Sequence, residues 1–334
     1  MIPMARNKRN SAGPSQTGVS VPNVTATDSE TDVINLGQSD TVVGAVSEPL
    51  TRRTAVGRAT LVWRRMRRMP TFWIGSSVLL LLVLAAIIMP MVYQYTPIEY
   101  DYANQLKGPS QYHWFGTNAQ GQDLFAQIMV GLRISLVVGF GTAIVVTVLA
   151  AFFGTLAGYF GGALDWGVVN LINFLLVVPS LLMMLLLSPI LQGAHWIFMV
   201  PLLAIFSWML TARVLRALTQ GLVNMEYVQA AKFMGVPHRK IIMRHIIPNI
   251  SSWMIIDTTL GVGGAILAET GLSFLGFGIL YPNFSLGSVL QGYNIAFPHT
   301  WVPAAIILAM LVVSINMVGE ALRDALDPTS GRGH

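Results

Sequence analysis

The sequence contains no cysteine and very few charged residues. The absence of cysteine excludes both disulfide bridges and thiolate metal sites. Charged residues make up only 10% of the 334 positions, whereas soluble domains carry about 25%. Hydrophobic residues, in contrast, make up 54% of the chain. This composition predicts an integral membrane protein.

Motifs for chemistry on a nucleotide or a metal are also missing. The chain has no G-x-x-x-x-G-K-[ST] phosphate loop, so ATP cannot be bound in that way. The glycines at 261, 263 and 264 lie in an apolar stretch, where small residues allow close contact between helices. The six histidines show no paired metal-ligand spacing. We therefore expect no catalytic residue, no metal and no cofactor in this chain.

The amino-terminal part of the chain is polar and ends in a run of arginines. Residues 1–60 lack a sustained apolar face, which predicts a disordered tail. No secretory signal peptide is evident, because the first apolar stretch begins only near Phe72. The arginines between positions 52 and 68 could bind nucleic acid, but directly before an apolar stretch they favour a membrane helix with its N-terminus inside. We therefore expect a cytoplasmic N-terminus and no nucleic-acid partner.

Six apolar stretches are long enough to cross a bilayer, which takes about 20 residues. They are Phe72–Tyr93, Ile134–Leu164 with a turn at its end, Trp166–Leu187, Trp196–Leu215, Ser252–Phe274 and Trp301–Gly319. With a cytoplasmic N-terminus, the inner segments 1–71, 158–165, 213–252 and 320–334 hold 10, 0, 6 and 2 of the 20 Lys and Arg residues. This bias agrees with the positive-inside rule. The sequence thus predicts an all-α membrane protein with six transmembrane helices and both termini in the cytoplasm.

Several polar or helix-breaking residues have structural interpretations. We expect Asp123 to cap a helix start on the outer side and Asp165 to cap the third span, while Pro179 predicts a bend inside that span. Asp257 and Glu269 interrupt the fifth span, 12 residues and therefore about 18 Å apart. We expect Asp257 near the inner interface. For Glu269 we favour a structural hydrogen bond, with a place on a translocation path as the alternative.

The longest polar interruption in the apolar second half of the chain is residues 226–249, which we interpret as two short helices. The i, i+3, i+4, i+7 spacing predicts one helical face made of Tyr227, Ala230, Ala231 and Met234. Gly235 suits the left-handed position after the first helix, and Pro237 suits the first turn of the second. We expect Pro248 to end the second helix. This pattern fits a loop helix packed on its own protein as well as a surface that contacts another subunit.

The same segment resembles the EAA loop of ABC-importer membrane subunits, in the form found in the dipeptide, oligopeptide and nickel permease family. The matching letters are EYV at 226–228, AA at 230–231, G at 235 and RHIIPN at 244–249. Gln229 stands where the motif usually has a glutamate. Further similar runs, covering roughly residues 60–328, are HWFGTNAQGQD at 113–123, GYFGGALD at 158–165, GLSFLGFG at 271–278 and GEALRDALDP at 319–328. In the first of these, Asn118 and Gln122 replace an aspartate and an arginine.

The resemblance implies a type I ABC importer permease fold at 61–328 in a bacterial inner membrane, flanked by tails at 1–60 and 329–334. It implies a non-catalytic subunit that pairs with a homologous permease, contacts two ATP-binding subunits that bind Mg-ATP, and receives di- or oligopeptides from an extracytoplasmic binding protein. The residues it assigns to coupling are Glu226, Tyr227, Ala230, Ala231, Met234 and Gly235. Nickel, glutathione or another small solute is the alternative cargo. The alternative class is an ion-coupled secondary transporter that uses Asp257 and Glu269.

Overall fold

The computed structural model describes residues 58–191 and 195–326, and every regular element in this part of the chain is helical. The long helices are α2 (Pro70–Val92), α3 (Leu124–Phe160), α10 (Ile247–Phe274) and α12 (Val302–Leu326). Each is long and apolar enough to cross a membrane, α10 together with the helical turns from His238 that precede it. The all-α prediction is therefore confirmed.

Two further candidate spans are made of helices that are bent at a break. In the first, α4 (Gly162–Val177) meets α5 (Ser180–Leu187) at an angle of 78°, so the bend predicted at Pro179 is confirmed. In the second, η3 (Trp196–Phe198) and α6 (Met199–Ile205) meet α7 (Trp208–Val223) at 47°. The described residues thus hold four candidate spans, or six if each bent pair is one span.

The second break was not predicted, because neither proline nor glycine stands there. Ser207 lies at the break, and its hydroxyl donates to the carbonyl of Leu203 at 2.8 Å. A serine that bonds four residues back competes with the helix ladder and often bends a helix. The sequence signal for this bend is one polar residue in an apolar run, which periodicity alone does not single out.

The short elements lie at the ends of the long helices. They are α1 (Arg58–Met66), α8 (Glu226–Phe233), α9 (His238–Ile241), the π-helical turn η4 (Ile242–Ile246), α11 (Leu286–Leu290), and the 3-10 turns η1 (Tyr102–Asn104), η2 (Ser188–Leu191) and η5 (Pro298–Thr300). The first three residues of α1 fall within the predicted tail 1–60; the rest of that tail and the predicted tail 329–334 lie outside the described residues.

The start of the second span was predicted wrongly. We expected it at Ile134, directly after Arg133, whereas α3 begins ten residues earlier at Leu124. Arg133 is exposed within the helix, so its charge costs little there and does not mark a boundary. A long side chain can also keep its charged head in water while its stem covers apolar surface.

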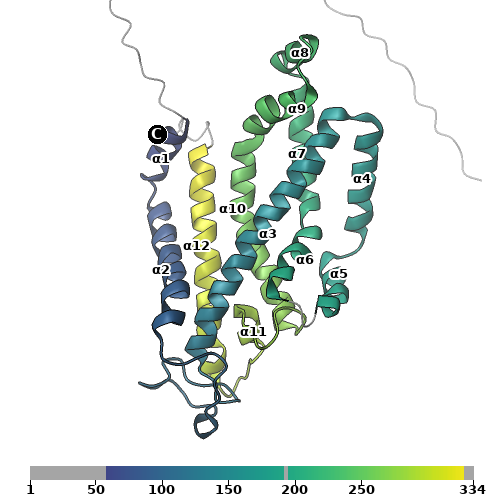
Figure 1. Cartoon of the computed structure of the whole chain (residues 1–334). Coiled ribbons are helices and arrows are strands. Elements are labelled where there is room, and N and C mark those ends of the chain that lie inside the picture. Colours follow the sequence, from purple (N-terminus) through teal and green to yellow (C-terminus); the bar gives the residue numbers. More distant parts are fainter. Residues whose placement is uncertain (1–57, 192–194, 327–334) are drawn as a thin grey trace, which may run out of the picture. The chain divides into compact units, whose positions relative to one another are not determined.

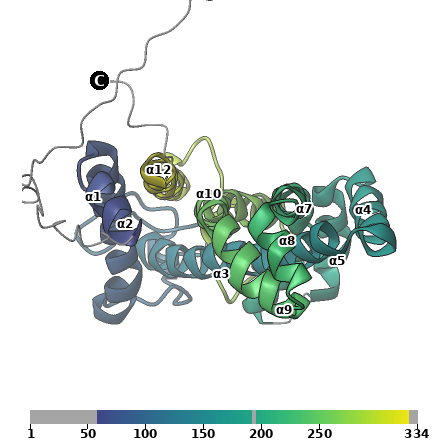
Figure 2. The same ribbon diagram turned by 90° about the horizontal axis from the view of Figure 1, so that it is seen from above.

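Helix α3 runs through the middle of the described bundle and packs along α7 and α10, while α12 packs against α2 and α10 (Figures 1 and 2). Two glycines of α3, four residues apart, allow the backbones of α3 and α7 to approach closely. A Cβ atom on Gly154 would lie 2.5 Å from the carbonyl oxygen of Ala212, and one on Gly158 would lie 2.6 Å from that of Arg216. The spacing is the G-x-x-x-G pattern that lets two membrane helices touch backbone to backbone.

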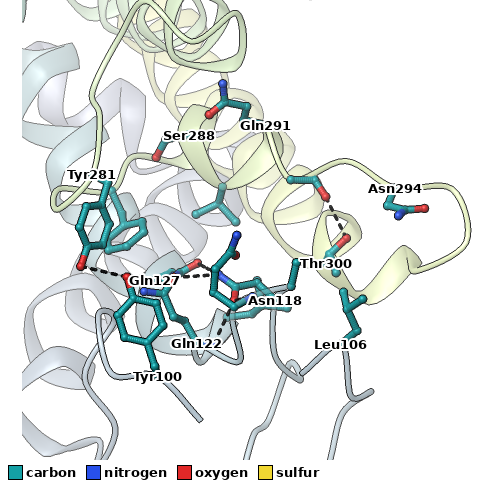
Figure 3. A pocket seen from close by; sticks show the side chains of 16 residues that line it. Tyr100, Leu106, Asn118, Gln122, Gln127, Tyr281, Ser288, Gln291, Asn294 and Thr300 are labelled. Atoms are coloured by element: carbon teal, nitrogen blue, oxygen red, sulfur yellow. Dashed lines mark hydrogen bonds between the residues drawn. The ribbon is translucent and has the colours of Figure 1, made fainter. Parts of the chain in front are cut away.

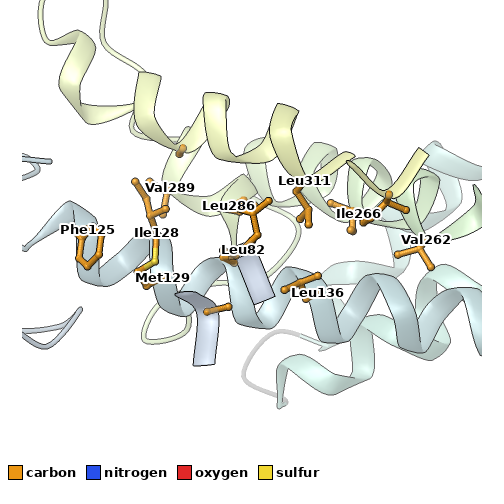
Figure 4. Packing of buried hydrophobic residues seen from close by; sticks show 14 of the residues in the cluster. Leu82, Phe125, Ile128, Met129, Leu136, Val262, Ile266, Leu286, Val289 and Leu311 are labelled. Carbon is orange, nitrogen blue, oxygen red and sulfur yellow. The ribbon is translucent and has the colours of Figure 1, made fainter. Parts of the chain in front are cut away.

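Buried side chains form separate clusters along the bundle. One joins α2, α3, α10, α11 and α12, and Figure 4 shows Leu82, Ile128, Ile266 and Leu311 of this cluster. A second lies beneath α8 and includes Trp208, Leu215, Val228, Ala231, Ile241 and Ile246. Lipid tails are as apolar as leucine, so van der Waals packing holds such clusters together within the membrane.

The two ends of the bundle differ in charge. In Figure 1, α1, α8, α9 and the C-terminal end of α12 lie at one end, and α11 lies near the other with the segment that leads into α3. The end with α8 carries most of the basic side chains of the described residues: Arg64, Arg65, Arg67, Arg68, Lys232, Arg239, Lys240, Arg244 and Arg323. We call it the basic end.

Candidate functional site

Helix α8 projects from the basic end on a tight connection from α7. The backbone N–H of Met225 donates to the carbonyl of Leu222 at 3.1 Å, and α8 begins at the next residue, Glu226. Glu226 stands in the first turn, and Lys232 stands in the last turn. These charges match the helix dipole at each end, which stabilises a helix of only eight residues.

The end of α8 confirms the role predicted for Gly235. Gly235 has φ +72°, its N–H donates to the carbonyl of Lys232 at 3.0 Å, and the N–H of Val236 donates to that of Ala231 at 3.1 Å. These two bonds form a Schellman motif, which needs a residue in the left-handed region that glycine adopts without a Cβ clash. The reversal between α8 and α9 is therefore fixed by the sequence.

The predicted face of α8 is split between surface and core. Glu226, Tyr227, Ala230 and Met234 are exposed, whereas Ala231 is only 4% exposed and packs in the cluster beneath the helix. Val228 is fully buried beside it. Ala231 therefore anchors α8 to its own chain, and the surface open to another protein is formed by the other members.

Sequence reasoning missed the most exposed apolar side chain of this segment. Phe233 is 89% exposed and neighbours Met234, which is 75% exposed. Two large apolar side chains directly before the turn glycine were the available signal, because the periodicity argument selected only the alanine face. We call the exposed set Tyr227, Ala230, Phe233 and Met234 the α8 tip.

Gln229, the departure from the family motif, has a specific contact. Its amide nitrogen donates to the carbonyl of Val223, the last residue of α7, at 2.8 Å. The last carbonyls of a helix lack partners within the helix, and a side-chain donor can satisfy one of them. An ionised glutamate has no N–H to donate, so the amide at this position ties α8 to the end of α7.

The prediction that Pro248 ends a helix is wrong. The chain stays helical from His238 to Phe274, and Pro248 lies in the first turn of α10. The π-helical turn Ile242–Ile246 directly precedes it. A π turn inserts one residue into the ladder, so the helix accommodates the missing N–H of the proline without stopping. Pro237 stands as the residue before α9, one position earlier than predicted.

The loop between α8 and α9 is also held from α3. The hydroxyl of Tyr159 shares a 2.7 Å hydrogen bond with Nδ1 of His238, and Nζ of Lys232 lies 4.9 Å from the centre of the Tyr159 ring. The distance is that of a cation–π contact. Tyr159 thus connects both short helices to α3.

At the opposite end, Asp123 is the centre of a buried polar network. It caps α3 as predicted, accepting from the backbone N–H of Ala126 at 2.8 Å. Its other oxygen contacts Nδ1 of His113 at 2.8 Å and accepts from the hydroxyl of Tyr93 at 3.0 Å. Burial, together with the nearby Asp123 carboxylate, raises the pKa of Tyr93 well above its usual range. This network holds together the segment between α2 and α3, residues 93–123, which we call the outer segment after its predicted side of the membrane.

Beside it lies an outer pocket of about 510 Å³ whose lining carries no charged side chain (Figure 3). Asn118 donates to Gln122 at 2.9 Å, so the two departures from the family's charged residues bond to each other. Gln127 also donates to Gln122, at 2.8 Å. Across the pocket, Tyr100 donates to Tyr281 at 3.3 Å. Neutral amides thus replace a charge pair without leaving a buried charge.

Glu269 has the structural hydrogen bonds that we favoured for it. It is fully buried, and it accepts from Ser135 on α3 at 3.1 Å and from Ser273 on its own helix at 2.6 Å. The Ser135 hydroxyl in turn accepts from the backbone N–H of Leu286, the first residue of α11, at 3.2 Å. The carboxylate therefore joins α3, α10 and α11 from within the protein.

Asp257 has a different environment. It is partly exposed, accepts from the hydroxyl of Thr211 at 3.0 Å, and lines a cavity of about 270 Å³ that does not include Glu269. Because α10 begins at Ile247 and not at Ser252, Asp257 also lies about 7.5 Å deeper along the helix than we expected. The two acids are not brought together.

The prediction for Asp165 is also wrong. Gly161 takes the cap position of α4, with φ +65°, and Asp165 lies within the first turn. There its carboxylate pairs with the guanidinium of Arg216 on α7 through two hydrogen bonds. The bidentate geometry suits arginine and connects the first bent span to the second.

The comparison with protein families agrees with this arrangement. Residues 150–331 match the family described as binding-protein-dependent transport system inner membrane component. Residues 58–109 match the N-terminal transmembrane domain of oligopeptide transport permease C. The first match contains α8, α9 and the whole of α10, and the second contains α1 and α2.

Curated relatives extend the likeness over most of the chain. The oligopeptide transport system permease protein OppC of Mycobacterium tuberculosis (strain ATCC 25618 / H37Rv) is 42% identical over 277 residues, which is 82% of this chain and 95% of that protein. OppC of Haemophilus influenzae is 33% identical, covering 90% of this chain and 99% of that protein. The dipeptide permease DppC of Bacillus subtilis is 32% identical, covering 83% and 88%. The chain therefore belongs to the family of inner membrane components of binding-protein-dependent transport systems, as a permease with an N-terminal part of the OppC type.

Proposed function

We propose that this chain is a six-span permease of an ATP-driven importer for di- or oligopeptides. It pairs with a homologous permease to form the translocation path, binds two ATP-binding subunits at α8 and α9, and receives its cargo from an extracytoplasmic binding protein. The cargo class rests on relatives that are named oligopeptide and dipeptide transport permeases. This chain binds its partner subunits and transmits their movement to the membrane spans, while the ATP-binding subunits hydrolyse Mg-ATP.

The six-span count follows if each bent pair crosses the membrane once. A polar or broken helix is tolerated at membrane depth where other protein segments cover it. The clustering of Lys and Arg at the basic end supports a cytoplasmic position for α8 and for both chain termini under the positive-inside rule. This is a type I importer permease arrangement with the fold domain at 61–328.

The observation that carries the proposal is the α8 tip. Phe233, 89% exposed, and Met234, 75% exposed, lie on the helix that projects from the basic end. Exposed apolar side chains on a projecting element are typical of a protein interface. Aromatic residues and methionine are enriched in such interfaces. A separate subunit that encloses the tip accounts for both the exposure and the short, rigid reversal at Gly235.

Force would pass from the tip into the spans by the contacts already described. Val228 and Ala231 hold α8 on the buried cluster, Gln229 holds the end of α7, and Tyr159 holds the following turn to α3. A movement of the ATP-binding subunits then shifts α3 and α7 together with α8. Conversion of such closure into alternating access is a rigid-body switching device.

A co-purification experiment tests the proposal. The double variant Phe233→Ala, Met234→Ala should reduce recovery of the ATP-binding subunits at least tenfold, because buried aromatic anchors dominate binding energy at interfaces. Insertion into the membrane should be normal. Met243→Ala, which truncates an exposed methionine outside the tip, is the matched control and should recover the full complex. Full recovery with the double variant would contradict the proposed docking site.

The rival class, an ion-coupled secondary transporter, needs no partner. Asp257 and Glu269 would be its ion sites, yet Glu269 is fully buried and already accepts two hydroxyl hydrogen bonds. Purified alone in liposomes, such a transporter accumulates solute on an ion gradient, whereas the proposed permease requires ATP and its partners. Identification of the ligand that co-purifies on the binding protein separates peptide from nickel, glutathione or another small solute.

A further inference from the structure

We propose that the cavity around Asp257 binds an ammonium group, and that its ligand is the free amino terminus of a peptide in transit. This inference rests on the proposed peptide transport and adds a binding site within the membrane to it. The cavity lies between α3, the α6–α7 bend and α10. These are neighbouring helices of the described bundle (Figure 1).

The cavity is polar in a part of the chain that is otherwise apolar. Its volume is about 270 Å³, and its polar lining consists of one carboxylate and five hydroxyl groups, from Thr142, Thr147, Ser207, Thr211, Asp257 and Thr258. Aliphatic side chains and glycines complete the wall. A space of this size holds several waters at about 30 Å³ each, so it also has room for an amino group with part of the residue that carries it.

Asp257 is an acidic side chain without a basic partner. Among the described residues, no Lys or Arg forms an ion pair with Asp257, whose recorded contact is the hydroxyl of Thr211 at 3.0 Å. The nearest basic residues along α7 are engaged elsewhere: Arg213 donates to Asn173 at 2.5 Å, and Arg216 pairs with Asp165. An acid in a membrane span ordinarily pairs or faces a functional cavity. A cationic ligand supplies the missing partner.

A buried hydroxyl in the same cavity lacks a hydrogen-bond partner. Thr142 is 1% exposed, and its Oγ1 has no hydrogen-bond partner among the residues that the structure describes. Buried side-chain oxygens nearly always have a partner, so this oxygen indicates a ligand or water that bonds to it. An ammonium group carries three N–H donors, which a carboxylate oxygen and hydroxyl oxygens can accept.

The side chains that line the cavity suit an ammonium group better than a bare metal ion. Among the described residues there is no group of three or more His, Cys, Asp or Glu side chains that could hold a metal. Two of the hydroxyls bond to each other, with Thr147 and Thr258 2.6 Å apart, so one of them donates to the other and only the second can donate to a carbonyl of its own helix. Calcium and magnesium sites are built from oxygen ligands that usually include several carboxylates, whereas this cavity offers one carboxylate, that of Asp257.

Two glycines of α10, Gly261 and Gly264, line the cavity, so this part of its wall carries no side chains. A Cβ atom added to Gly264 would meet no other atom within 4 Å, and this exposed glycine lines the cavity. A larger side chain at this position would fill the space without displacing a neighbour. Gly271 on the same helix has equally open surroundings but does not line the cavity. Gly264 and Gly271 provide a matched pair of variants.

The test measures binding of radiolabelled tri-alanine, with a free or an acetylated amino terminus, to the complete importer in nanodiscs without its binding protein. The wild-type complex should bind the free peptide at least tenfold more tightly than the acetylated one, since a hydrogen bond to a charged group is worth about that ratio. Asp257→Asn should make the two affinities equal. Gly264→Leu should abolish binding of both peptides, and Gly271→Leu should leave both unchanged.

Thr142→Val supplies a readout that a purely structural role would not give. Removing a buried hydroxyl that lacks a partner should leave the thermal midpoint of the complex unchanged or raised. Its affinity for tri-alanine should nevertheless fall severalfold. A lower midpoint together with unchanged affinity would overturn the assignment of this hydroxyl to a ligand.

Two results would overturn the ammonium site itself. One is equal affinity of the wild-type complex for free and acetylated tri-alanine; the other is binding of radioactive sodium or rubidium that depends on Asp257 while tri-alanine affinity does not. Failure of the proposed function gives a separate signal, namely no ATP-driven uptake of tri-alanine by the wild-type complex with its binding protein. Normal uptake with no effect of Asp257→Asn would reject only the ammonium site.

Discussion

The outer segment and the α8 tip meet their surroundings in opposite ways. Asp123, 2% exposed, satisfies its helix start, His113 and Tyr93 within one chain. Phe233, 89% exposed, has no comparable enclosure. The polar groups of the outer segment find partners within one chain, whereas the α8 tip leaves apolar surface exposed, where we propose that a second protein binds. We infer that mutations at the outer segment act mainly on stability, and mutations at the α8 tip mainly on assembly.

The largest expected effect is on stability, from a substitution of Asp123 in the outer segment. Asp123→Ala removes the α3 cap and leaves the buried His113 without its carboxylate partner, while the hydroxyl of Tyr93 keeps the carbonyl of Tyr112 as an acceptor. We expect destabilisation by about 3 kcal/mol, since a lost cap costs about 1 and an unsatisfied buried group about 1–3. Thermal unfolding of the purified complex measures it. Asp123→Asn, which can still cap, should cost less, and equal midpoints for Asp123→Ala and the wild type would refute the network's role.

The next effect separates core from surface within α8 itself. Ala231→Leu forces a larger side chain into the buried cluster, and overpacking costs about 1–3 kcal/mol. Ala230→Leu adds the same atoms on the exposed face, so it should leave the midpoint unchanged while weakening recovery of the ATP-binding subunits. Thermal unfolding and co-purification are measured on both variants. If the two lowered the midpoint equally, the division of this face into anchor and surface would be wrong.

A smaller effect is expected at the turn between the two short helices. Gly235→Ala puts a Cβ at φ +72°, which costs roughly 1 kcal/mol in the left-handed region. The tip should then tilt, so ATPase activity coupled to uptake should fall more than stability does. Gly235→Asn, which tolerates this region better, should lie between alanine and wild type. The same ratio of uptake to ATPase activity in all three proteins would argue against an angular role.

The smallest effect concerns the motif departure. Gln229→Glu restores the residue that the family usually has but removes the donor to the Val223 carbonyl, for which we expect a cost of about 0.5–1 kcal/mol. Hydrogen exchange at the end of α7 should become faster, while the ATP-binding subunits still assemble. Unchanged exchange there would show that the amide contact does not hold the helix end.

Composition and hydropathy predicted much of the fold, because a membrane span must hide its backbone in a helix of about 20 apolar residues. The bend at Pro179, the cap at Asp123 and the turn at Gly235 were also predictable, since each depends on the local chemistry of one residue. The boundaries were less so. Arg133 looked like a helix limit although it projects from α3, and Pro248 looked like a stop although a π turn absorbs it.

Features that depend on contacts between distant segments could not be read from the chain. Whether Ala230 or Ala231 faces inward is decided by the cluster beneath α8, not by their spacing. The pairing of Asp165 with Arg216 joins residues 51 positions apart. Phe233 was missed for a related reason. A single sequence does not distinguish an exposed aromatic residue from a core residue, whereas the structure shows that this side chain is exposed.

The most direct test of the central claim uses the absence of cysteine from the chain. Ala230→Cys and Gln120→Cys each place one thiol at an exposed position, in the α8 tip and in the outer segment respectively. A membrane-impermeant maleimide added to intact cells should label only residue 120. In inverted vesicles it should label only residue 230, and a crosslinker at residue 230 should capture an ATP-binding subunit. Labelling of residue 230 from outside the cell, or failure to capture any ATPase there, would contradict the account.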